Sequence, residues 1–293
     1  MITIASDFGS PYPAAMKGVI CQRPDARLID VAHDFPRQDV RAAAFWLREV
    51  LPYFPPATHL VVVDPGVGTD RNAIVVRAGE HVLVGPDNGV LWPTAQRLAP
   101  AADREVYVID ESRLEPVAPT GAGTTPRTQL GEGDAGGSVD RDREQGPASN
   151  TFHGRDVFAP AAAAAHGVDP TALGTLEFLS PTDAFVDLEV PEPTLEPAEA
   201  PAEADRAVGE VLVVDGFGNV ITNVPGGFLE GCDRIVANGE VVPVGQTFAA
   251  VDPGERLATV GSHGNVELDV NQGRGNDAFG LEVGDRVVLE GSD

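Results

Sequence analysis

The chain has 293 residues, 42% of them hydrophobic, and 45 acidic against 20 basic residues give a formal net charge of −25. This length predicts two domains, each with enough apolar residues for a core. Such a negative field repels phosphate backbones and argues against a nucleic-acid partner. No apolar run approaches the roughly 20 residues of a membrane helix, which argues against a membrane partner. Cys21 and Cys232 lie far apart without metal-ligand spacing, which argues against a disulfide framework.

Residues 1–190 alternate short apolar runs with segments of helical periodicity. This order is typical of an α/β domain with a mainly parallel sheet covered by helices on both faces. The expected strands are 2–5, 28–31, 60–63, 73–76, 81–84 and 105–109. The expected helices are 13–21, 40–54, 91–98 and 157–166.

The remainder of the chain changes character three times. Residues 121–150 lack apolar periodicity and are interpreted as a low-complexity acidic insertion without a fixed fold. Residues 191–206, rich in Pro, Glu and Ala, predict a linker. Residues 207–293 alternate short strands with turn signals, which predicts an all-β, barrel-like domain. Its expected strands are 208–214, 219–224, 233–236, 257–260, 265–270 and 286–290.

The basic residues are unusual in kind, because Lys17 is the only lysine and all the others are arginine. An acidic surface poor in lysine is compatible with high salt, since counter-ions screen its self-repulsion. We therefore expect a halophilic protein. The first residues, MITIASD, enter a strand pattern without the basic and apolar blocks of a signal peptide, so we also expect a cytoplasmic protein.

A carboxylate stands at the end of the apolar run 60–63. Asp64 opens the turn-forming sequence DPGVG, which ends the strand. In open α/β sheets, ligands bind at the C-terminal ends of the strands. A tight turn there would bring Arg71 close to Asp64. Taken alone, the stretch is equally compatible with an ordinary ion pair on a surface turn.

Other polar residues occupy comparable places. Asp7 follows the first expected strand, Asn88 lies in the turn signal GPDNG, and His153 precedes the last helix of the first domain. In the second domain, the stretch 213–223 combines a carboxylate, an aromatic ring and amides around glycine turns. By composition alone, that stretch favours an ordinary β-hairpin.

Seven short motifs follow one another in an order that covers nearly the whole chain. They are SDFG at 6–9, DPGVG at 64–68 with Arg71, GPDNG at 85–89, TFHGR at 151–155, DGFGNVITN at 215–223, TF at 247–248 and the stretch 262–273. Each is weak alone, but the ordered set resembles the S-adenosylmethionine hydroxide adenosyltransferases, relatives of fluorinase and chlorinase. The resemblance implies a homotrimer whose sites lie where the first domain of one subunit meets the second domain of the next.

The family reaction, as the resemblance implies it, is attack of water or hydroxide on C5′ of S-adenosylmethionine, with release of adenosine and methionine. A sulfonium is already a good leaving group, so no metal or other cofactor is implied, and the scarce component is the nucleophile. The resemblance assigns this chemistry to Asp64, Arg71 and His153. Arg71 would stabilise the charge developing on water, while His153 and Asp64 would hold the water in line and accept its proton.

The resemblance also implies substrate contacts. Asp7 would accept hydrogen bonds from both ribose hydroxyls. Asp215 and Ser262 would bind the amino and carboxylate ends of methionine, and Asn219 and Phe248 would contact adenine. Further candidates for the substrate pocket are Phe217, Asn88 and His263.

Two of the polar residues have two interpretations each, and His33 is a further candidate. His263 either contacts the methionine carboxylate or has a structural role. Asn88 is equally a ligand or a turn former. His33 follows a strand, as Asp7 does, and is a candidate for contacting the site residues without contacting the substrate itself.

The same residues are also compatible with functions other than metal-independent hydrolysis. A metal-dependent hydrolase could use Asp7, Asp64 and His153 as ligands, and a non-catalytic sensor could bind adenosine or S-adenosylmethionine without turnover. Halogenation is disfavoured, because Asp64 stands where the halogenating relatives carry a hydroxyl residue, and a carboxylate repels halide. Val67 and Gly154 likewise replace hydroxyl residues that contact halide in those relatives.

Overall fold

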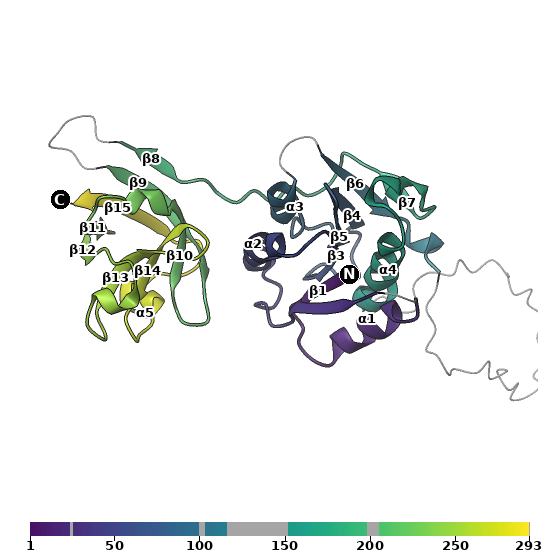
Figure 1. Ribbon diagram of the computed structural model, residues 1–293, viewed down its shortest axis with the longest axis horizontal. Helices are drawn as coiled ribbons and strands as arrows, with labels where there is room; N and C mark the ends of the chain where they lie inside the picture. Colours follow the sequence, from purple (N-terminus) through teal and green to yellow (C-terminus); the bar gives the residue numbers. More distant parts are fainter. Residues whose placement is uncertain (24–25, 100–102, 116–151, 198–204, 293) are drawn as a thin grey trace, which may run out of the picture. The chain divides into compact units, whose positions relative to one another are not determined.

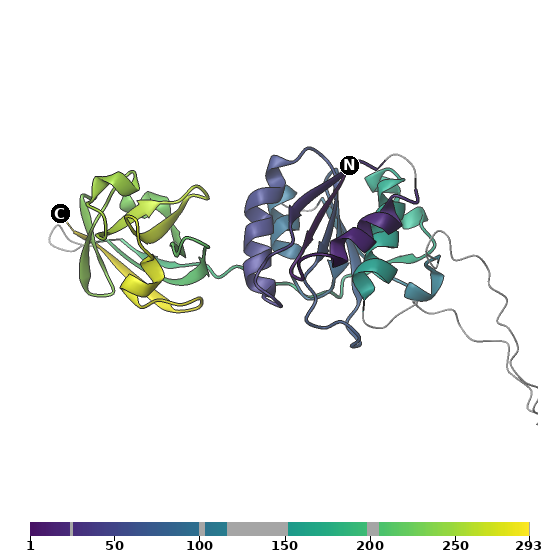
Figure 2. The same cartoon turned by 90° about the horizontal axis from the view of Figure 1, so that it is seen from below.

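The computed structural model describes residues 1–23, 26–99, 103–115, 152–197 and 205–292, so the predicted insertion 121–150 lies outside the described residues. The chain divides into two compact units, which we call unit 1 (Met1–Leu188) and unit 2 (Glu189–Asp293). Figures 1 and 2 show the two units in perpendicular views. Each unit is described by itself.

Over its described residues, unit 1 is built on a seven-stranded sheet with the order β2-β1-β3-β5-β4-β6-β7. The strands are β1 (Ile2–Ser6), β2 (Leu28–Ala32), β3 (Thr58–Val62), β4 (Ala73–Ala78), β5 (His81–Pro86), β6 (Arg104–Ile109) and β7 (Leu179–Pro181). Strands β2, β1, β3 and β5 run parallel, whereas β4, β6 and β7 join by antiparallel pairings. The predicted α/β class is confirmed, and the sheet is mixed.

Helices cover both faces of this sheet (Figures 1 and 2). They are α1 (Tyr12–Ile20), α2 (Val40–Val50), α3 (Trp92–Leu98) and α4 (Ala159–His166), and a π-helical turn (Gly154–Phe158) precedes α4. One core joins α1 and α4 to the alternating strand residues that include Ile4 and Leu60, and the other joins α2 and α3 to those that include Val61 and Leu83. Successive strand residues therefore feed opposite cores, as strand geometry requires.

Sequence features fix the positions of two helices, α2 and α4. The side chain of Asp39 caps α2 by accepting a hydrogen bond from the Ala42 amide at 2.9 Å. Pro52 follows the last turn, so α2 ends at Val50 and a short 3₁₀ turn replaces the end of the longer helix that the sequence predicts. In α4, a run of buried alanines lets the helix backbone approach the sheet closely.

A stacked pair of histidines lies at the edge of the sheet where the parallel strands begin. His59 contacts the Thr3 hydroxyl through Nδ1 at 2.7 Å and His81 Nδ1 through Nε2 at 2.9 Å, and the two stacked imidazole rings are nearly parallel, with an angle of 12° between their planes. Burial, and then the neighbouring His81, lowers the pKa of His59 to about 3. His59 therefore stays neutral in the folded protein through the weakly acidic range.

Acid is expected to destabilise unit 1 through this pair. Unfolded His59 binds a proton below its ordinary pKa of 6.5, and folded His59 does not until about pH 3, so the free energy of unfolding falls as pH drops through that window. The expected slope is about 1.4 kcal/mol per pH unit. Denaturant unfolding of the wild type and His59→Gln at pH 4, 5, 6 and 7 measures it. Parallel pH curves for the two proteins would contradict this assignment.

Unit 2 is an eight-stranded antiparallel sheet over its described residues. Its strands are β8 (Thr194–Glu196), β9 (Arg206–Val214), β10 (Val220–Pro225), β11 (Arg234–Ala237), β12 (Glu240–Pro243), β13 (Arg256–Val260), β14 (Asn265–Val270) and β15 (Arg286–Ser292). A bridge between Val244 and Ala258 links the two ends of the order β12-β11-β15-β9-β10-β14-β13, so the sheet is nearly closed around an apolar core. The predicted barrel-like domain is confirmed.

Part of the predicted linker belongs to the sheet of unit 2. Within the interval 191–206, β8 pairs antiparallel with β9, and Leu195 lies opposite Ala207. A Pro- and Glu-rich composition can therefore still form an edge strand when a neighbouring strand supplies the ladder. A short helix, α5 (Gly275–Phe279), is also present without having been predicted. None of the helices in the described ranges is long and apolar enough to cross a membrane.

Candidate active site

The parallel strands of unit 1 end at one edge of the sheet, and polar residues follow them there. Asp7 comes after β1, His33 after β2, Asp64 after β3 and Asn88 after β5. The C-terminal edge of a parallel sheet is the usual position for ligand sites in α/β proteins. The sequence placed each of these residues at a strand end, and the topology of the sheet gathers them at the same edge.

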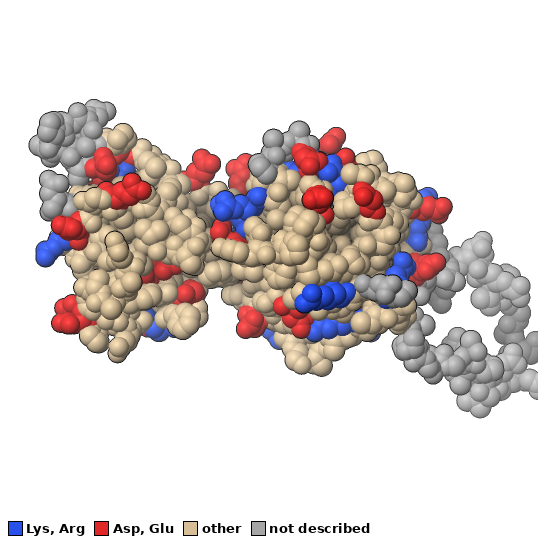
Figure 3. Space-filling model, viewed as in Figure 1, with Lys and Arg blue, Asp and Glu red and all other residues tan. Residues whose placement is uncertain are grey.

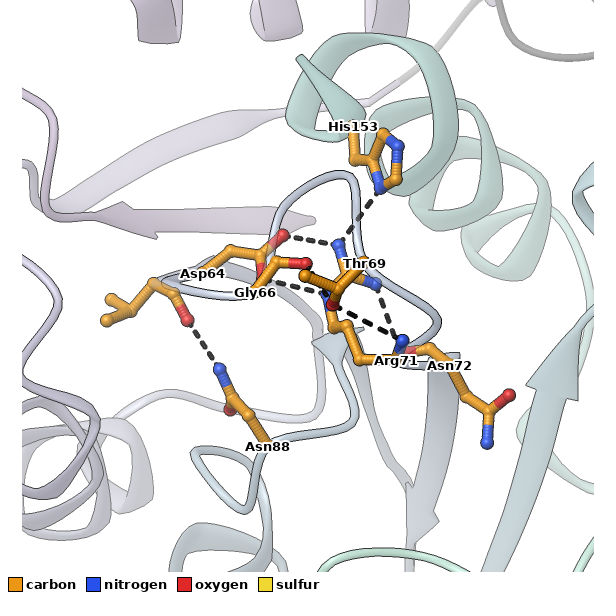
Figure 4. Close-up of polar contacts among 8 residues, drawn as sticks. Asp64, Gly66, Thr69, Arg71, Asn72, Asn88 and His153 are labelled. Carbon is orange, nitrogen blue, oxygen red and sulfur yellow. Dashed lines mark hydrogen bonds and ion pairs between the residues drawn. The ribbon is translucent and has the colours of Figure 1, made fainter. Parts of the chain in front are cut away.

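Asp64 and Arg71 form a bidentate ion pair across the turn that separates β3 from β4 (Figure 4). Arg71 Nε donates to Asp64 Oδ1 at 2.7 Å, and Nη2 donates to Oδ2. The side chain of Arg71 is only 10% exposed, and that of Asp64 only 6%. A pair this shielded is screened little by solvent and differs in this respect from an ordinary ion pair on a surface turn.

His153 joins this pair from a distant part of the chain. Arg71 Nη2 lies 3.0 Å from His153 Nδ1, as Figure 4 shows, and His153 is buried at the start of the π-helical turn. A guanidinium has only donors, so Nδ1 must accept this hydrogen bond. In this contact the imidazole therefore carries its proton on Nε2, which makes no hydrogen bond to the residues that the structure describes and can donate to an oxygen atom.

Two further contacts hold the guanidinium in place. Its central carbon lies 5.0 Å from the centroid of the Phe158 ring, which is fully buried, and Nη1 donates to the Asn72 carbonyl at 3.1 Å. The cation–π contact stabilises the charge without neutralising it. Phe158 was not predicted as a site residue; it lies five residues after His153, at the end of the π-helical turn that His153 precedes.

Asn88 supports Asp64 through the backbone. Its side-chain Nδ2 donates to the carbonyl of Val63 at 2.9 Å, and its Oδ1 accepts from the Val90 amide at 3.1 Å. These bonds connect the turn after β5 to the residue that precedes Asp64, which is the turn-forming role. A direct contact between Asn88 and a substrate stays a prediction.

Asp7 is held in the loop that follows β1. It is 9% exposed, and its Oδ2 accepts a hydrogen bond from the backbone amide of Gln38 at 2.6 Å. Gln38 has a left-handed backbone (φ 63°), a conformation that turns its N–H toward the carboxylate. The carboxylate is thus fixed in orientation near the strand ends that carry Asp64.

Most of the predicted substrate residues of unit 2 lie on two hairpins, β9–β10 and β13–β14, and Phe248 begins a 3₁₀ turn between β12 and β13. Asp215 Oδ1 accepts from the amides of Phe217 and Asn219, both at 2.9 Å, and its Oδ2 accepts from the Asn219 side chain at 3.1 Å. This is the hairpin structure that composition favours. The Phe217 ring at its tip is 81% exposed, and Phe248 is 42% exposed.

On the second hairpin of unit 2, Ser262 and His263 differ in exposure. Ser262 is exposed, whereas the His263 side chain is 5% exposed and its Nε2 lies 2.8 Å from Glu267 Oε1. This pairing supports the structural interpretation of His263. The assignment of either residue to the methionine end of a substrate stays a prediction.

Comparison with known proteins agrees with this two-unit architecture. A model of the SAM hydroxide adenosyltransferase N-terminal domain matches residues 2–174, and one of the SAM hydroxide adenosyltransferase C-terminal domain matches residues 209–288. The chain therefore belongs to the SAM hydroxide adenosyltransferase family, as the ordered motifs predict.

Two similar proteins and one solved structure span almost the whole chain. An (R)-S-adenosyl-L-methionine hydrolase of Thermus thermophilus is 40% identical over 97% of both chains. The protein of the same name from Salinispora tropica is 36% identical over 98% of this chain and 96% of its own. A crystal structure of a conserved protein from Thermotoga maritima is 31% identical, covers 99% of both chains and has a TM-score of 0.74.

Proposed function

We propose that the protein hydrolyses S-adenosyl-L-methionine to adenosine and L-methionine by attack of water or hydroxide on C5′. The observation that carries this proposal is the guanidinium of Arg71, buried and bonded to both Asp64 and His153. The relatives named above are (R)-S-adenosyl-L-methionine hydrolases, and we propose the same preference for the (R) sulfonium here.

The neutral tautomer of His153 refines the roles of the three residues. Because Nδ1 already accepts from Arg71, the Nε2–H group donates to the attacking water and orients it. Each oxygen of Asp64 keeps a lone pair beyond its bond to Arg71, so Asp64 is the proton acceptor. Arg71 stabilises the negative charge that develops on the water oxygen. As the O–C5′ bond forms, the C5′–S bond breaks, and its electron pair returns to sulfur as the thioether of methionine.

The occupied donor atoms disfavour the metal-dependent alternative. A cation at Asp7, Asp64 and His153 would compete with Arg71 for both oxygens of Asp64 and for His153 Nδ1. Among the described residues, no three His, Cys, Asp or Glu side chains converge in a way that suits a metal ion. A chelator is therefore expected to leave turnover unchanged. Loss of activity that a divalent ion restores would favour the metal enzyme.

Halogenation is disfavoured by space as well as by charge. A Cβ atom at Gly154 would lie 2.9 Å from Met16 Sδ and 3.0 Å from Phe152 Cε2, so a hydroxyl-bearing residue there requires a shift of its neighbours. The carboxylate of Asp64 repels an anion. In reactions with added chloride or fluoride, adenosine is expected to be the sole nucleoside product, without halogenated adenosine.

The experiment that tests the proposed function supplies each sulfonium epimer separately to the purified protein in high salt and identifies products by chromatography. Equimolar adenosine and methionine from the (R) epimer are expected. Bound substrate without methionine release would instead support a sensor.

Asp7→Ala is expected to weaken substrate binding far more than turnover. A ribose contact acts similarly in the ground state and the transition state, so its loss raises KM and leaves kcat nearly unchanged. Losing hydrogen bonds to a charged acceptor costs about 1.5–3 kcal/mol, which corresponds to a roughly 10- to 150-fold rise in KM. Steady-state kinetics on the wild type, Asp7→Asn and Asp7→Ala measure the effect. An equal fall in kcat for Asp7→Ala would contradict the binding role.

We also propose that the protein is a cytoplasmic homotrimer with its active sites at the interfaces between subunits. The exposed aromatic rings of Phe217 and Phe248 support this proposal, because large apolar side chains on a surface mark contact regions. Sedimentation of the full chain in high salt is expected to give three times the mass of 30.6 kDa. A monomer that turns over substrate at the full rate would contradict the interfacial site.

Halophily is part of the same proposal. The net charge of −25 is carried by acidic side chains that, on the face in Figure 3, are scattered rather than gathered in one patch. Diffuse self-repulsion of this kind is relieved by counter-ions. We expect the melting temperature to rise steadily from dilute buffer to molar KCl. A melting temperature independent of salt would contradict it.

A further inference from the structure

A chain of hydrogen-bonded side chains runs from the end of β1 to the surface. The hydroxyl of Ser6 lies 2.7 Å from His33 Nδ1, and His33 Nε2 lies 3.0 Å from Asp30 Oδ1. The other oxygen of Asp30 accepts from Lys17 Nζ at 2.6 Å, so the single lysine of the protein is committed here. The order Ser, His, Asp resembles a nucleophilic triad, but Ser6 is fully buried and contacts no open space.

The chain of contacts replaces a strand ladder that has ended. The register of β1 against β2 shifts between Ile4 and Ala5, and the last paired residues are Ala5 and Ala32. Beyond that point His33 makes one contact with the last residue of β1 and one with the loop that follows it. Its ring binds the Ser6 hydroxyl, and its carbonyl accepts from the Gly9 amide at 2.8 Å. These contacts fall on either side of Asp7.

We infer that His33 is a positioning residue that fixes the carboxylate of Asp7 for the ribose of the substrate. The inference rests on the proposed function, because Asp7 is the residue assigned to the ribose hydroxyls. On one side of Asp7, the Ser6 hydroxyl is hydrogen-bonded to the His33 imidazole. On the other side, the Gly9 amide donates to the His33 carbonyl. The Gln38 amide then sets the direction of the carboxylate itself.

The contact between His33 and Ser6 is the one that fixes the position of Asp7. Two conservative substitutions of His33 separate this contact from the contact with Asp30. The amide of asparagine reaches the position of Nδ1, whereas the amide of glutamine reaches the position of Nε2. His33→Asn therefore keeps the bond to Ser6, and His33→Gln keeps the bond to Asp30. His33→Phe keeps neither.

The test measures KM and kcat for S-adenosylmethionine and, independently of turnover, the Kd for adenosine by calorimetry. His33→Phe and His33→Gln are expected to raise KM and the adenosine Kd about tenfold each, with kcat within threefold of wild type. His33→Asn is expected to restore both values to within threefold. Ser6→Ala should reproduce His33→Phe, and the double variant should be no worse than either single one.

His81→Phe is the matched control, because His81 is also a partly buried, hydrogen-bonded histidine but lies at the opposite edge of the sheet. It is expected to change the adenosine Kd less than twofold. An unchanged Kd in His33→Phe, or the same loss in His81→Phe and His33→Asn, would overturn the inference. Because adenosine binding is read without catalysis, a protein that binds adenosine but releases no methionine refutes the proposed function and leaves this test intact.

Discussion

Replacing Arg71 with alanine is expected to lower kcat by about 100- to 1,000-fold while KM changes only a few-fold. Among the described residues, the guanidinium is the positive charge that contacts both Asp64 and His153, and it acts where charge develops on the attacking water. Loss of a single preorganised donor to such an oxygen typically costs this much in turnover. Because the charge develops only in the transition state, the effect falls on kcat. Arg71→Lys should be nearly as poor, since an ammonium cannot make the bidentate contact.

The control for Arg71 is Arg77. Its side chain is also 10% exposed, and it pairs with Asp103 and Glu105 away from the strand ends that form the site. Removing either arginine leaves carboxylates without their partner and lowers stability, so each variant is assayed below its own melting temperature. Arg77→Ala is expected to lower the melting temperature with kcat within threefold of wild type. Equal losses of kcat in the two variants would show that Arg71 acts through stability alone.

The second large effect is expected at Asp269, a fully buried carboxyl group on β14. Neither of its oxygens receives a hydrogen bond from an N–H group of the described residues. Burial, and then the carboxylates of Glu267 and Asp215, raise the pKa of Asp269 to about 8. The group is therefore protonated in the folded protein at neutral pH, an unusual state for an aspartic acid.

Stability is expected to fall as pH rises through neutrality because of Asp269. The unfolded chain releases this proton near pH 3.8 and the folded chain only near pH 8, so the unfolded state gains relative stability across that window. Asp269→Asn cannot ionise and removes this dependence. Its free energy of unfolding relative to wild type is expected to rise by about 1.4 kcal/mol per pH unit, or about 3 kcal/mol between pH 5 and pH 7.

Denaturant unfolding at pH 5, 6, 7 and 8 measures this difference, and Asp277→Asn is the control. The Asp277 side chain is 70% exposed on α5, so its substitution is expected to leave the pH profile of stability unchanged. If wild type and Asp269→Asn follow the same profile, Asp269 is ionised in the folded protein and the assignment is wrong. A profile that steepens in Asp277→Asn would likewise count against it.

The local geometry around Asp64 could be predicted from sequence, because an apolar run followed by proline and glycines defines both a strand end and a tight turn. That geometry brings Arg71 back within seven residues. His153 could not be joined to them by any local rule, since it lies 82 residues from Arg71. Only the ordered motifs of a known family connected the three.

Two features of the sheets were not predicted, although both depend on tight turns between strands that are neighbours in sequence. The antiparallel course of β4 beside β5 depends on a tight hairpin between neighbouring strands, which alternation with helices does not predict. The strand β12 follows the strong hairpin signal Asn238-Gly239, whose positive φ angles of 49° and 88° fit the turn, and a closer reading of that dipeptide would have found it.

The burial of Asp269 was also beyond local prediction. The alternation of residues 265–270 is that of a strand with one solvated face, and on that face Glu267 and Asp269 would be exposed. In the structure both are buried: Gly275 at the start of α5 packs over the backbone of Asp269, and the carboxylate of Glu267 lies against His263. Gly275 lies only six residues after Asp269, but the Asn276 amide of α5 also donates to the carbonyl of Gly218 at 2.9 Å, and that hairpin is distant in sequence. Contacts outside the strand therefore convert its solvated face into an interior one.

Hydrolysis of (R)-S-adenosyl-L-methionine in ¹⁸O-labelled water tests the central claim most directly. Attack of solvent on C5′ places one labelled oxygen in the 5′-hydroxyl of adenosine and none in methionine, and mass spectrometry of both products reads this out. The predicted result is labelled adenosine and unlabelled methionine, with the labelled adenosine formed about 100- to 1,000-fold more slowly by Arg71→Ala. Unlabelled adenosine, or label found only in the methionine fragment, would contradict the proposed chemistry.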